Sequence, residues 1–385
     1  MNIPLLKEIR NRFEQSFSAS PQLFRSPGRI NLIGEHTDYN NGFVLPAAID
    51  KNLFFAIAPN NSQTVNIEAY DINESISFQF GDVNSEKEWV KYFIGVTTLL
   101  KDKGLKTGFD CVFGGDIPLG AGLSSSAALT CGLAYSLNKV FSLGLNRKEI
   151  AFLAQKTEHE FIGVKCGIMD QFAVLFGKDN ACIKLDCRNL DYEYIPLELG
   201  DYRIVLFDTG VKHSLASSAY NDRRSDCETG VAILKKENFV INSLRDVNPT
   251  FLNQQEKNLG EQVFQRCSYI VNEIKRTEDA CEDLKNGKIS SLGAKMYKTH
   301  YGLQHLYEVS CKELDFLVGL VAQNNNVIGA RMMGGGFGGC TINLIHKTAE
   351  NEIINYAKKS YFNKFNRELQ VYQMPLANGV SECDL

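Results

Sequence analysis

Glycines and serines dominate the stretch from Gly114 to Ala128, which reads GGDIPLGAGLSSSAA. A strand-like run precedes it, from Phe109 to Phe113, and an apolar stripe with helical spacing follows it. A strand, a flexible loop and a helix start in this order form an anion site, because the first N–H groups of a helix lack partners and carry partial positive charge. The lysine of a P-loop is absent, so a phosphate would be held by backbone donors and serine hydroxyls. A flexible turn with a serine helix cap is the alternative that the pattern leaves open.

Acidic residues and one histidine crowd a second stretch. Glu35, His36 and Asp38 fall on a predicted turn, and acceptors clustered in this way suit the hydroxyl groups of a sugar better than a metal ion. A solvated turn explains them equally well. Two further carboxylates, Glu158 and Asp170, lie beside the apolar stripes of predicted helices. Together with the glycine and serine loop and the acceptor-rich turn that Arg29 precedes, these carboxylates are the parts of a phosphoryl-transfer site. Such a site needs neutralised phosphate charge, a metal held by oxygen ligands and a group that orients the acceptor hydroxyl.

Two other motifs are rejected. Gly334 to Gly339 satisfies G-x-G-x-x-G, but a strand-like run follows it where a dinucleotide-binding fold requires a helix, so we predict a glycine-rich hairpin. Asp208-Thr209-Gly210 resembles the active turn of an aspartic protease, but the chain has no second turn to pair with it.

Hydrophobic periodicity predicts the elements that position these residues. We expect an N-terminal helix with a stripe of Leu5, Ile9 and Phe13, and a short strand from Arg29 to Ile33. Further predicted strands are Leu53 to Ala58, Thr64 to Tyr70, Ser75 to Phe80, Ala181 to Leu185 and Tyr192 to Leu197. Two further helices are predicted from Glu86 to Lys103 and from Ile168 to Phe176. Another helix begins at the serines. A fourth begins at a capping box formed by Asn146 and Glu149 and ends at Gly163.

The second half is predicted to be mixed. A strand from Arg203 to Phe207 begins it, and helical patterns occupy most of the span from Leu215 to Asn324. The glycine-rich hairpin, a helix and a last strand, Leu369 to Met374, complete an α+β unit. We place the domain boundary near Asn189, so that residues 1–190 form the first domain and 191–385 the second.

Composition excludes several classes of function. The 385 residues are 44% hydrophobic and 22% charged, and the net charge of −4 gives no reason to expect nucleic acid or an anionic membrane as a partner. Eleven cysteines without a C-x-x-C pair argue against disulfides and a zinc site. We find no signal peptide and no apolar run long enough to span a membrane, and we expect a cytoplasmic monomer with no obligate protein partner.

Four segments together resemble the galactokinase branch of the GHMP kinase family. Pro27 to Asn40, PGRINLIGEHTDYN, is similar to the galactokinase signature nearly residue for residue. Gly114 to Ala128 resembles the phosphate-binding motif of the wider family, and Met333 to Cys340 resembles its C-terminal glycine motif. Cys166 to Gln171, CGIMDQ, is particular to the galactokinase branch. The resemblance extends from about Phe24 to the last predicted strand.

This resemblance implies a two-domain α+β fold, with an N-terminal α/β domain, a C-terminal ferredoxin-like domain and the active site in the cleft between them. Asp170 would be the base that accepts the proton of the galactose C1 hydroxyl, and Arg29 would lie beside it and stabilise the transferring phosphoryl group. The residues implied to bind the sugar are Arg29, Glu35, His36, Asp38, Gly167, Asp170 and Tyr220. ATP would bind at Gly120, Ala121, Gly122, Leu123, Ser124, Ser125 and Ser126. Mg²⁺ would bind Ser126, with or without Ser125, and Glu158, and Trp89 would contact adenine or serve only the core.

Two alternatives stay open at this point. A sensor that binds galactose and ATP without turnover is disfavoured, because the serine loop, Arg29, Glu158 and Asp170 are all present. A kinase for N-acetylgalactosamine or L-arabinose is compatible with the same motifs, since the residues around the sugar 2-position lie outside them.

Overall fold

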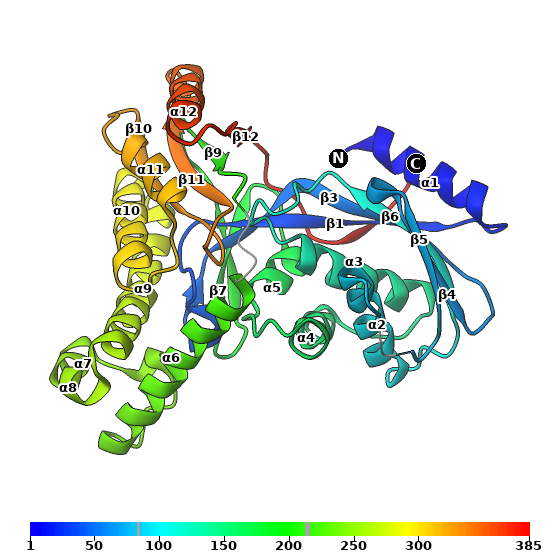
Figure 1. Cartoon of the computed structure of the whole chain (residues 1–385), viewed down its shortest axis with the longest axis horizontal. Coiled ribbons are helices and arrows are strands. Elements are labelled where there is room, and N and C mark those ends of the chain that lie inside the picture. Colours follow the sequence, from blue (N-terminus) through cyan, green and yellow to red (C-terminus); the bar gives the residue numbers. More distant parts are fainter. Residues whose placement is uncertain (83–84, 212–215) are drawn as a thin grey trace.

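The computed structural model describes residues 1–82, 85–211 and 216–385, with the side chains of 216 and 217 outside that description. Leu215, where the sequence predicts the long helical region to begin, therefore lies outside the described residues. Figure 1 shows two parts side by side: a sheet with short helices, and a second part bordered by two long helices.

A six-stranded sheet in the order β13-β1-β3-β6-β4-β5 forms the first part, and every neighbouring pair is antiparallel except β4 and β6. The strands are β1 (Gln22–Asn31), β3 (Pro46–Pro59), β4 (Thr64–Ala69), β5 (Glu74–Gln79), β6 (Phe109–Gly115) and β13 (Ser381–Cys383). β2 (Phe43–Val44), β7 (Ala181–Asp186) and β8 (Tyr192–Pro196) make a separate three-stranded sheet.

Helices cover both faces of the large sheet. Figure 1 shows α1 (Ile3–Ser16) on one side and α2 (Glu88–Lys101), α3 (Ser125–Val140), α4 (Arg147–Thr157) and α5 (Met169–Phe176) on the other. Alternate residues of β3 serve the two faces: Phe54 packs in the cluster under α1, whereas Phe55 packs in the larger core on the other side. The 3₁₀ turns η1 (Asp38–Asn40) and η2 (Tyr70–Ile72) and the π-helical turn η3 (Glu158–Ile162) connect these elements.

The sequence predictions need correction on three points in this part: the buried face of α1, the starts of two strands and the C-terminus. The buried stripe of α1 is Leu6, Ile9 and Phe13, and Leu5 packs against the same cluster while partly exposed, so the predicted stripe lacked Leu6. Two strands start earlier than predicted. The strand predicted from Arg29 to Ile33 extends from Gln22 to Asn31, and a register shift between Pro27 and Gly28 interrupts the alternation in the part that the prediction left out. The strand predicted from Leu53 to Ala58 begins at Pro46. The third correction concerns the C-terminus, to which the sequence assigned no structure. Ser381–Cys383 forms the edge strand β13 on β1.

The second part is built on a four-stranded antiparallel sheet in the order β10-β11-β9-β12. Its strands are β9 (Tyr202–Asp208), β10 (Val327–Met332), β11 (Cys340–His346) and β12 (Gln370–Tyr372). Its helices are α6 (Ala216–Glu237), η4 (Leu244–Asp246), α7 (Pro249–Gln254), α8 (Glu256–Leu259), α9 (Glu261–Lys285), α10 (Ile289–His305), α11 (Lys312–Val321) and α12 (Glu350–Phe365). The glycine-rich segment 334–339 joins β10 to β11, which confirms the predicted hairpin.

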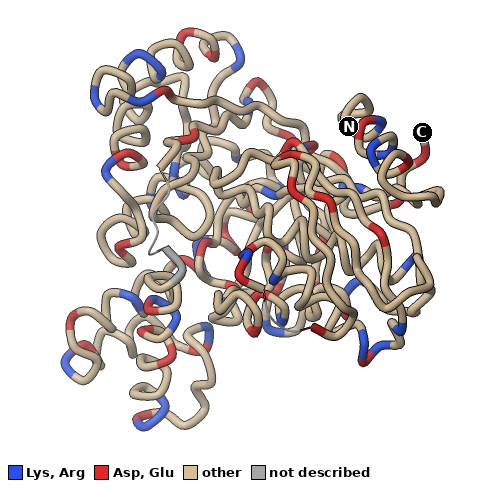
Figure 2. The backbone as a smooth tube through the Cα atoms, turned by 45° about the vertical axis from the view of Figure 1, so that its right-hand side comes forward, with Lys and Arg blue, Asp and Glu red and all other residues tan. Residues whose placement is uncertain are grey.

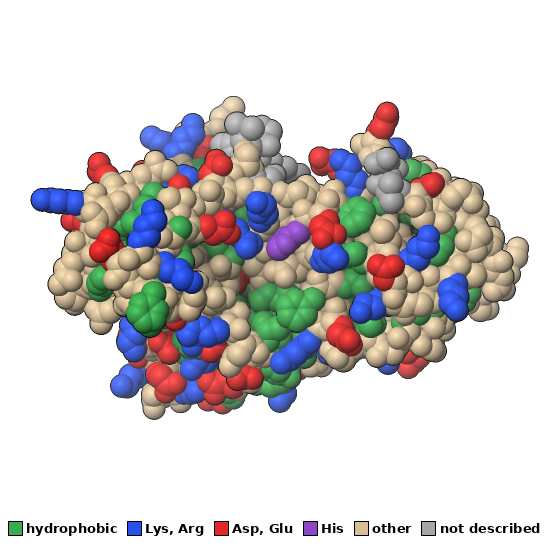
Figure 3. Space-filling model, turned by 90° about the horizontal axis from the view of Figure 1, so that it is seen from below, with side chains coloured by type: hydrophobic (Ala, Val, Ile, Leu, Met, Phe, Trp, Pro, Cys, Tyr) green, Lys and Arg blue, Asp and Glu red, His purple; other side chains and the backbone are tan. Residues whose placement is uncertain are grey.

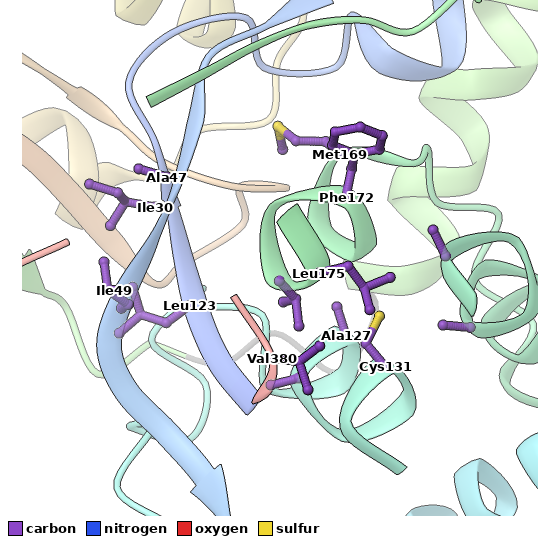
Figure 4. Packing of buried hydrophobic residues seen from close by; sticks show 14 of the residues in the cluster. Ile30, Ala47, Ile49, Leu123, Ala127, Cys131, Met169, Phe172, Leu175 and Val380 are labelled. Carbon is purple, nitrogen blue, oxygen red and sulfur yellow. The ribbon is translucent and has the colours of Figure 1, made fainter. Parts of the chain in front are cut away.

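The last residues of the chain return to the first part. Val380 N–H donates to the Val174 carbonyl at 2.9 Å, and Arg147 donates to the carbonyls of Val380 and Leu175. Figure 4 shows Val380 and Leu175 near Ala127 and Cys131 of α3, so the tail packs into the core beneath α3 and α5. The domain boundary near residue 190 stays a prediction.

All eleven cysteines are unpaired, as the sequence predicted. Among the described residues, no helix is long and apolar enough to cross a membrane. Figure 2 shows acidic and basic residues mixed along the backbone, and Figure 3 shows acidic and basic side chains interspersed on one face of the molecule. The cytoplasmic location and the monomeric state expected from the sequence stay predictions.

Candidate active site

A polar cavity of about 180 Å³ lies where the turn after β1, the start of α5, α6 and the β10–β11 loop meet. The structure brings together in its wall the residues predicted to bind sugar, metal or the reacting groups: Arg29, Glu35, His36, Asp38, Ser126, Glu158, Gly167, Asp170 and Tyr220. These residues come from segments as far apart as β1 and α6, and the structure places together the residues that the family resemblance implied.

Arg29 and Asp170 form a two-pronged ion pair at the centre of this wall. Arg29 Nε lies 2.8 Å from Asp170 Oδ1, and Nη2 lies 2.7 Å from Oδ2. Ser124 also donates to Oδ2. Because a carboxylate has about four acceptor positions, Oδ1 keeps one for a further donor. Burial is the largest single influence and opposes the charge of Arg29, but Asp170, Glu35 and Asp38 together raise the guanidinium pKa.

Arg29 also holds the glycine and serine loop. Its Nη1 donates to the Gly122 carbonyl at 2.5 Å, and its backbone N–H donates to the Leu123 carbonyl at 3.1 Å. Gly120 and Gly122 have positive φ angles of 81° and 75°, which glycine adopts without strain. Ser124 also has a positive φ, and its hydroxyl bonds to Asp170 instead of capping α3. The sequence favoured a phosphate or capping role for these serines and gave no sign of the Ser124 contact.

Asp38 lies against the segment that leads into α5. Its Oδ1 accepts from the Tyr39 N–H at 2.9 Å and its Oδ2 from the Met169 N–H at 3.3 Å. Burial and then the charge of Asp170 raise the pKa of Asp38 to about 6. A Cβ on Gly167 would lie 1.9 Å from Asp38 Oδ2, so the close packing of this carboxylate requires glycine at 167.

Glu35 is held from the second half of the molecule. Its Oε1 accepts from Arg331 Nη1 at 3.0 Å and from the Gly334 N–H at 2.9 Å. Arg331 is fully buried on β10 and was missed by the sequence analysis. The available signal was its place as a lone arginine in an apolar strand, directly before the glycine-rich hairpin.

Aromatic side chains surround His36. Its Nδ1 lies 2.8 Å from the Tyr39 hydroxyl, which lies 2.7 Å from that of Tyr307. The rings of Tyr220 and Tyr307 are 5.2 and 4.9 Å from the imidazole. Burial lowers the pKa of His36 to about 3, so the ring is neutral at physiological pH. The site can therefore offer a neutral imidazole, an aromatic face and several carboxylates to a polar ligand.

Glu158 begins the π-helical turn η3, a kind of distortion that is frequent at functional sites. Its Oε1 accepts from Gln171 Nε2 at 2.8 Å. Burial and then the charge of Asp170 raise the pKa of Glu158 to about 7, and hydrogen bonds from Gln171 and Ser126 oppose this rise. The Ser126 hydroxyl and the Glu158 carboxylate are oxygen donors that suit Mg²⁺, which commonly takes few protein ligands and completes its shell with water and phosphate. In the described part of the chain no cluster of three or more His, Cys, Asp or Glu forms a metal cage.

A second cavity, about 250 Å³ and mostly apolar, adjoins the start of α3. Leu53, Ala69, Asp71, Ile72, Trp89, Tyr92, Phe113, Leu119, Ser125, Ser126 and Leu129 line it. Trp89 also packs against Phe93 and Phe113, and its Nε1 donates to Glu74 at 3.2 Å. Its two predicted roles, contact with adenine and core packing, are thus both compatible with its position. Ser126 lines both cavities, which places the serine loop between them.

Comparisons with known proteins identify relatives of this chain. Residues 11–59 match the galactokinase galactose-binding signature, 91–178 the GHMP kinase N-terminal domain and 280–363 the GHMP kinase C-terminal domain. The chain is 38% identical to a galactokinase of Thermotoga neapolitana over 359 residues, covering 93% of this chain and 99% of that protein. It is 37% identical to a galactokinase of Clostridium perfringens over 386 residues, covering 98% and 99%.

Solved structures extend the comparison to the fold. A Lactococcus lactis galactokinase in complex with galactose superimposes with a TM-score of 0.94 at 32% identity, covering 98% of this chain and all of that one. A mevalonate kinase shares the fold with a TM-score of 0.62 at 20% identity. The expected architecture is confirmed: an N-terminal α/β domain and a C-terminal ferredoxin-like domain with the site in the cleft between them.

Proposed function

The chain belongs to the galactokinase family of ATP-dependent GHMP sugar kinases, and from this premise we propose that it transfers the γ-phosphoryl group of ATP to the C1 hydroxyl of α-D-galactose. The products are galactose 1-phosphate and ADP. One observation carries the proposal: the Arg29–Asp170 pair faces the polar cavity at the point where the serine loop separates it from the apolar one. A sugar in the first cavity and a nucleotide in the second would meet there.

The transfer is direct and in line. The C1 oxygen of galactose forms a bond to the γ-phosphorus while the bond between that phosphorus and the bridging oxygen of ADP breaks. Asp170 accepts the hydroxyl proton at the position that remains open on Oδ1. Arg29 orients Asp170 through two hydrogen bonds and stabilises charge that develops on the phosphoryl oxygens.

Sugar recognition rests on the turn and on its neighbours. Glu35 and Asp38 accept hydrogen bonds from sugar hydroxyls, and His36, Gly167 and Tyr220 complete the pocket. The walls are buried, so a sugar that leaves one of these polar groups unpaired is rejected strongly.

The nucleotide end rests on Gly120 to Ser126, whose backbone N–H groups at the start of α3 receive the phosphates of ATP. The adenine ring occupies the apolar cavity beside Trp89. Ser126 and Glu158 would hold Mg²⁺, which would supply charge neutralisation on the phosphates.

A panel of sugars tests the proposal. We expect ADP release, followed by a coupled assay, to depend on added galactose and to be at least tenfold slower with N-acetylgalactosamine or L-arabinose. Galactose binding without ADP release would support the sensor instead, and faster turnover of another sugar would reassign the substrate.

A further inference from the structure

Arg331 is the largest fully buried polar side chain among the residues that the structure describes. It lies on β10 of the second half, but three of its four hydrogen bonds reach the first half. Nε donates to the Leu32 carbonyl at 2.8 Å, Nη2 donates to the Asn31 carbonyl, and Nη1 donates to Glu35 Oε1 at 3.0 Å. Nη1 also donates to the Met332 carbonyl at 2.6 Å. The guanidinium thus binds both the end of β1 and the first acidic residue of the sugar turn.

The two carboxylate oxygens of Glu35 have different surroundings. Oε1 accepts hydrogen bonds from Arg331 Nη1 and from the Gly334 N–H, so both of its acceptor positions are used within the protein. Within the described part of the chain, no protein donor contacts Oε2, and Glu35 lines the polar cavity. The side chain is only 1% exposed. Oε2 is therefore an open acceptor on a carboxylate whose orientation is fixed from behind.

We infer that Arg331 is a positioning residue for sugar binding, which fixes Glu35 so that Oε2 accepts a hydrogen bond from one sugar hydroxyl. The inference rests on the proposed function, since it assumes a sugar in the polar cavity. A planar guanidinium suits this task, because its fork reaches the carbonyls and the carboxylate at the same time and no other side chain provides that geometry.

The arrangement also links the sugar turn to the glycine-rich hairpin. Glu35 Oε1 accepts from Gly334, and a Cβ built on Gly334 would lie 3.5 Å from the Gly122 carbonyl of the serine loop. The carboxylate that faces the sugar is thus attached to the segment that borders the nucleotide loop. Sugar binding in this protein depends on a residue of the C-terminal domain that contacts no sugar itself.

The test compares Arg331→Met with Glu35→Gln by titration calorimetry with galactose and its 2-, 3-, 4- and 6-deoxy derivatives, in the absence of ATP. In the wild type we expect the loss of one particular hydroxyl to raise the dissociation constant by tenfold or more relative to galactose. This penalty is expected to depend on Glu35. That penalty should shrink to threefold or less in Glu35→Gln and in Arg331→Met alike. The double variant should bind galactose within threefold of Glu35→Gln, because the two residues act through one contact.

A merely structural role predicts a different pattern. Arg331→Met would then weaken all four deoxy sugars and galactose by the same factor, and its cost would add to that of Glu35→Gln, which overturns the inference. Arg147→Met is the matched control, because Arg147 also donates to two backbone carbonyls, those of Leu175 and Val380, but not to the sugar turn. We expect it to leave the deoxy pattern of the wild type unchanged.

A second variant at position 331 and the Glu35→Gln result allow the inference to be refuted even if Arg331→Met does not fold. If Arg331→Met does not fold, Arg331→Lys keeps the charge but loses the fork, and the same loss of one deoxy penalty is expected. If Glu35→Gln changes no deoxy penalty, the inference fails whatever the Arg331 variants do. A wild-type protein that binds no galactose would refute the proposed function, whereas normal galactose binding with an unaltered deoxy pattern in both Arg331 variants refutes only the positioning role.

Discussion

Gly167→Ala is the substitution whose effect follows most directly from the geometry of the proposed sugar pocket. The new Cβ would lie 1.9 Å from Asp38 Oδ2 and 2.0 Å from its Cγ. Real Cβ atoms do not approach heavy atoms closer than 3.0 Å, so the carboxylate or the backbone must move by more than 1 Å. The φ angle of Gly167 is not positive, and alanine therefore adds steric contact without backbone strain.

A displacement of about 1 Å at a positioned group costs roughly 100-fold in activity. We expect the KM for galactose, measured by coupled ADP release at saturating ATP, to rise by about 10- to 100-fold. The KM for ATP should change by less than about threefold, because the glycine and serine loop is not touched. Gly319→Ala is the control, because that glycine is exposed within α11 and has open space around it. We expect this substitution to raise the free energy of unfolding by about 0.5–1 kcal/mol and to leave the kinetics normal.

An Asp38→Ala background separates this explanation from general damage. With the carboxylate removed, the clash is gone, and Gly167→Ala should add less than about twofold to the KM for galactose. An unchanged KM for galactose in the single variant would refute the reasoning, as would an equal further loss in the double variant.

Three further perturbations probe other parts of the site. Asp170→Asn should lower kcat by at least about 1000-fold while the thermal unfolding midpoint stays within a few degrees; near-normal turnover would remove the base assignment. The pKa of Glu158 is raised from 4.5 to about 7 by burial and then by Asp170, so the folded protein keeps a proton that the unfolded chain has lost between these values. The free energy of unfolding without metal should therefore fall as pH rises through this window, and urea titrations of Glu158→Gln should show a shallower fall; identical slopes would contradict the pKa. Trp89→Ala should raise the KM for ATP by about tenfold and leave that for galactose unchanged if the indole contacts adenine, whereas lower stability with a normal KM would assign it to the core.

Local patterns were sufficient for those features whose physical causes are local. The capping box of Asn146 and Glu149, the end of that helical segment at Gly163 and the hairpin at 334–339 all depend on residues within a few positions of one another. The fold class and the gathering of the motifs came from the family resemblance and not from periodicity.

Contacts between distant segments were not predictable in the same way. Arg331 reaches Glu35 across 296 positions, and β13 pairs with a strand more than 300 residues earlier, so neither leaves a periodic signal. Ser124 was expected to serve phosphate or the helix end, yet its hydroxyl bonds to Asp170, because the positive φ at this residue turns it away from the first turn of α3. The roles of the individual site residues stay predictions until variants are measured.

The central claim is that the cleft joins the γ-phosphoryl group to the C1 oxygen of galactose with Asp170 as the base. The most direct measurement is proton and phosphorus NMR of the product formed from galactose and ATP, with calorimetry of galactose binding to Asp170→Asn. We predict phosphorus coupling to the anomeric proton with the wild type, and no product from an Asp170→Asn protein that is folded and still binds galactose. Phosphorus coupled to any other sugar proton, or the same product formed at a similar rate by Asp170→Asn, would contradict the account.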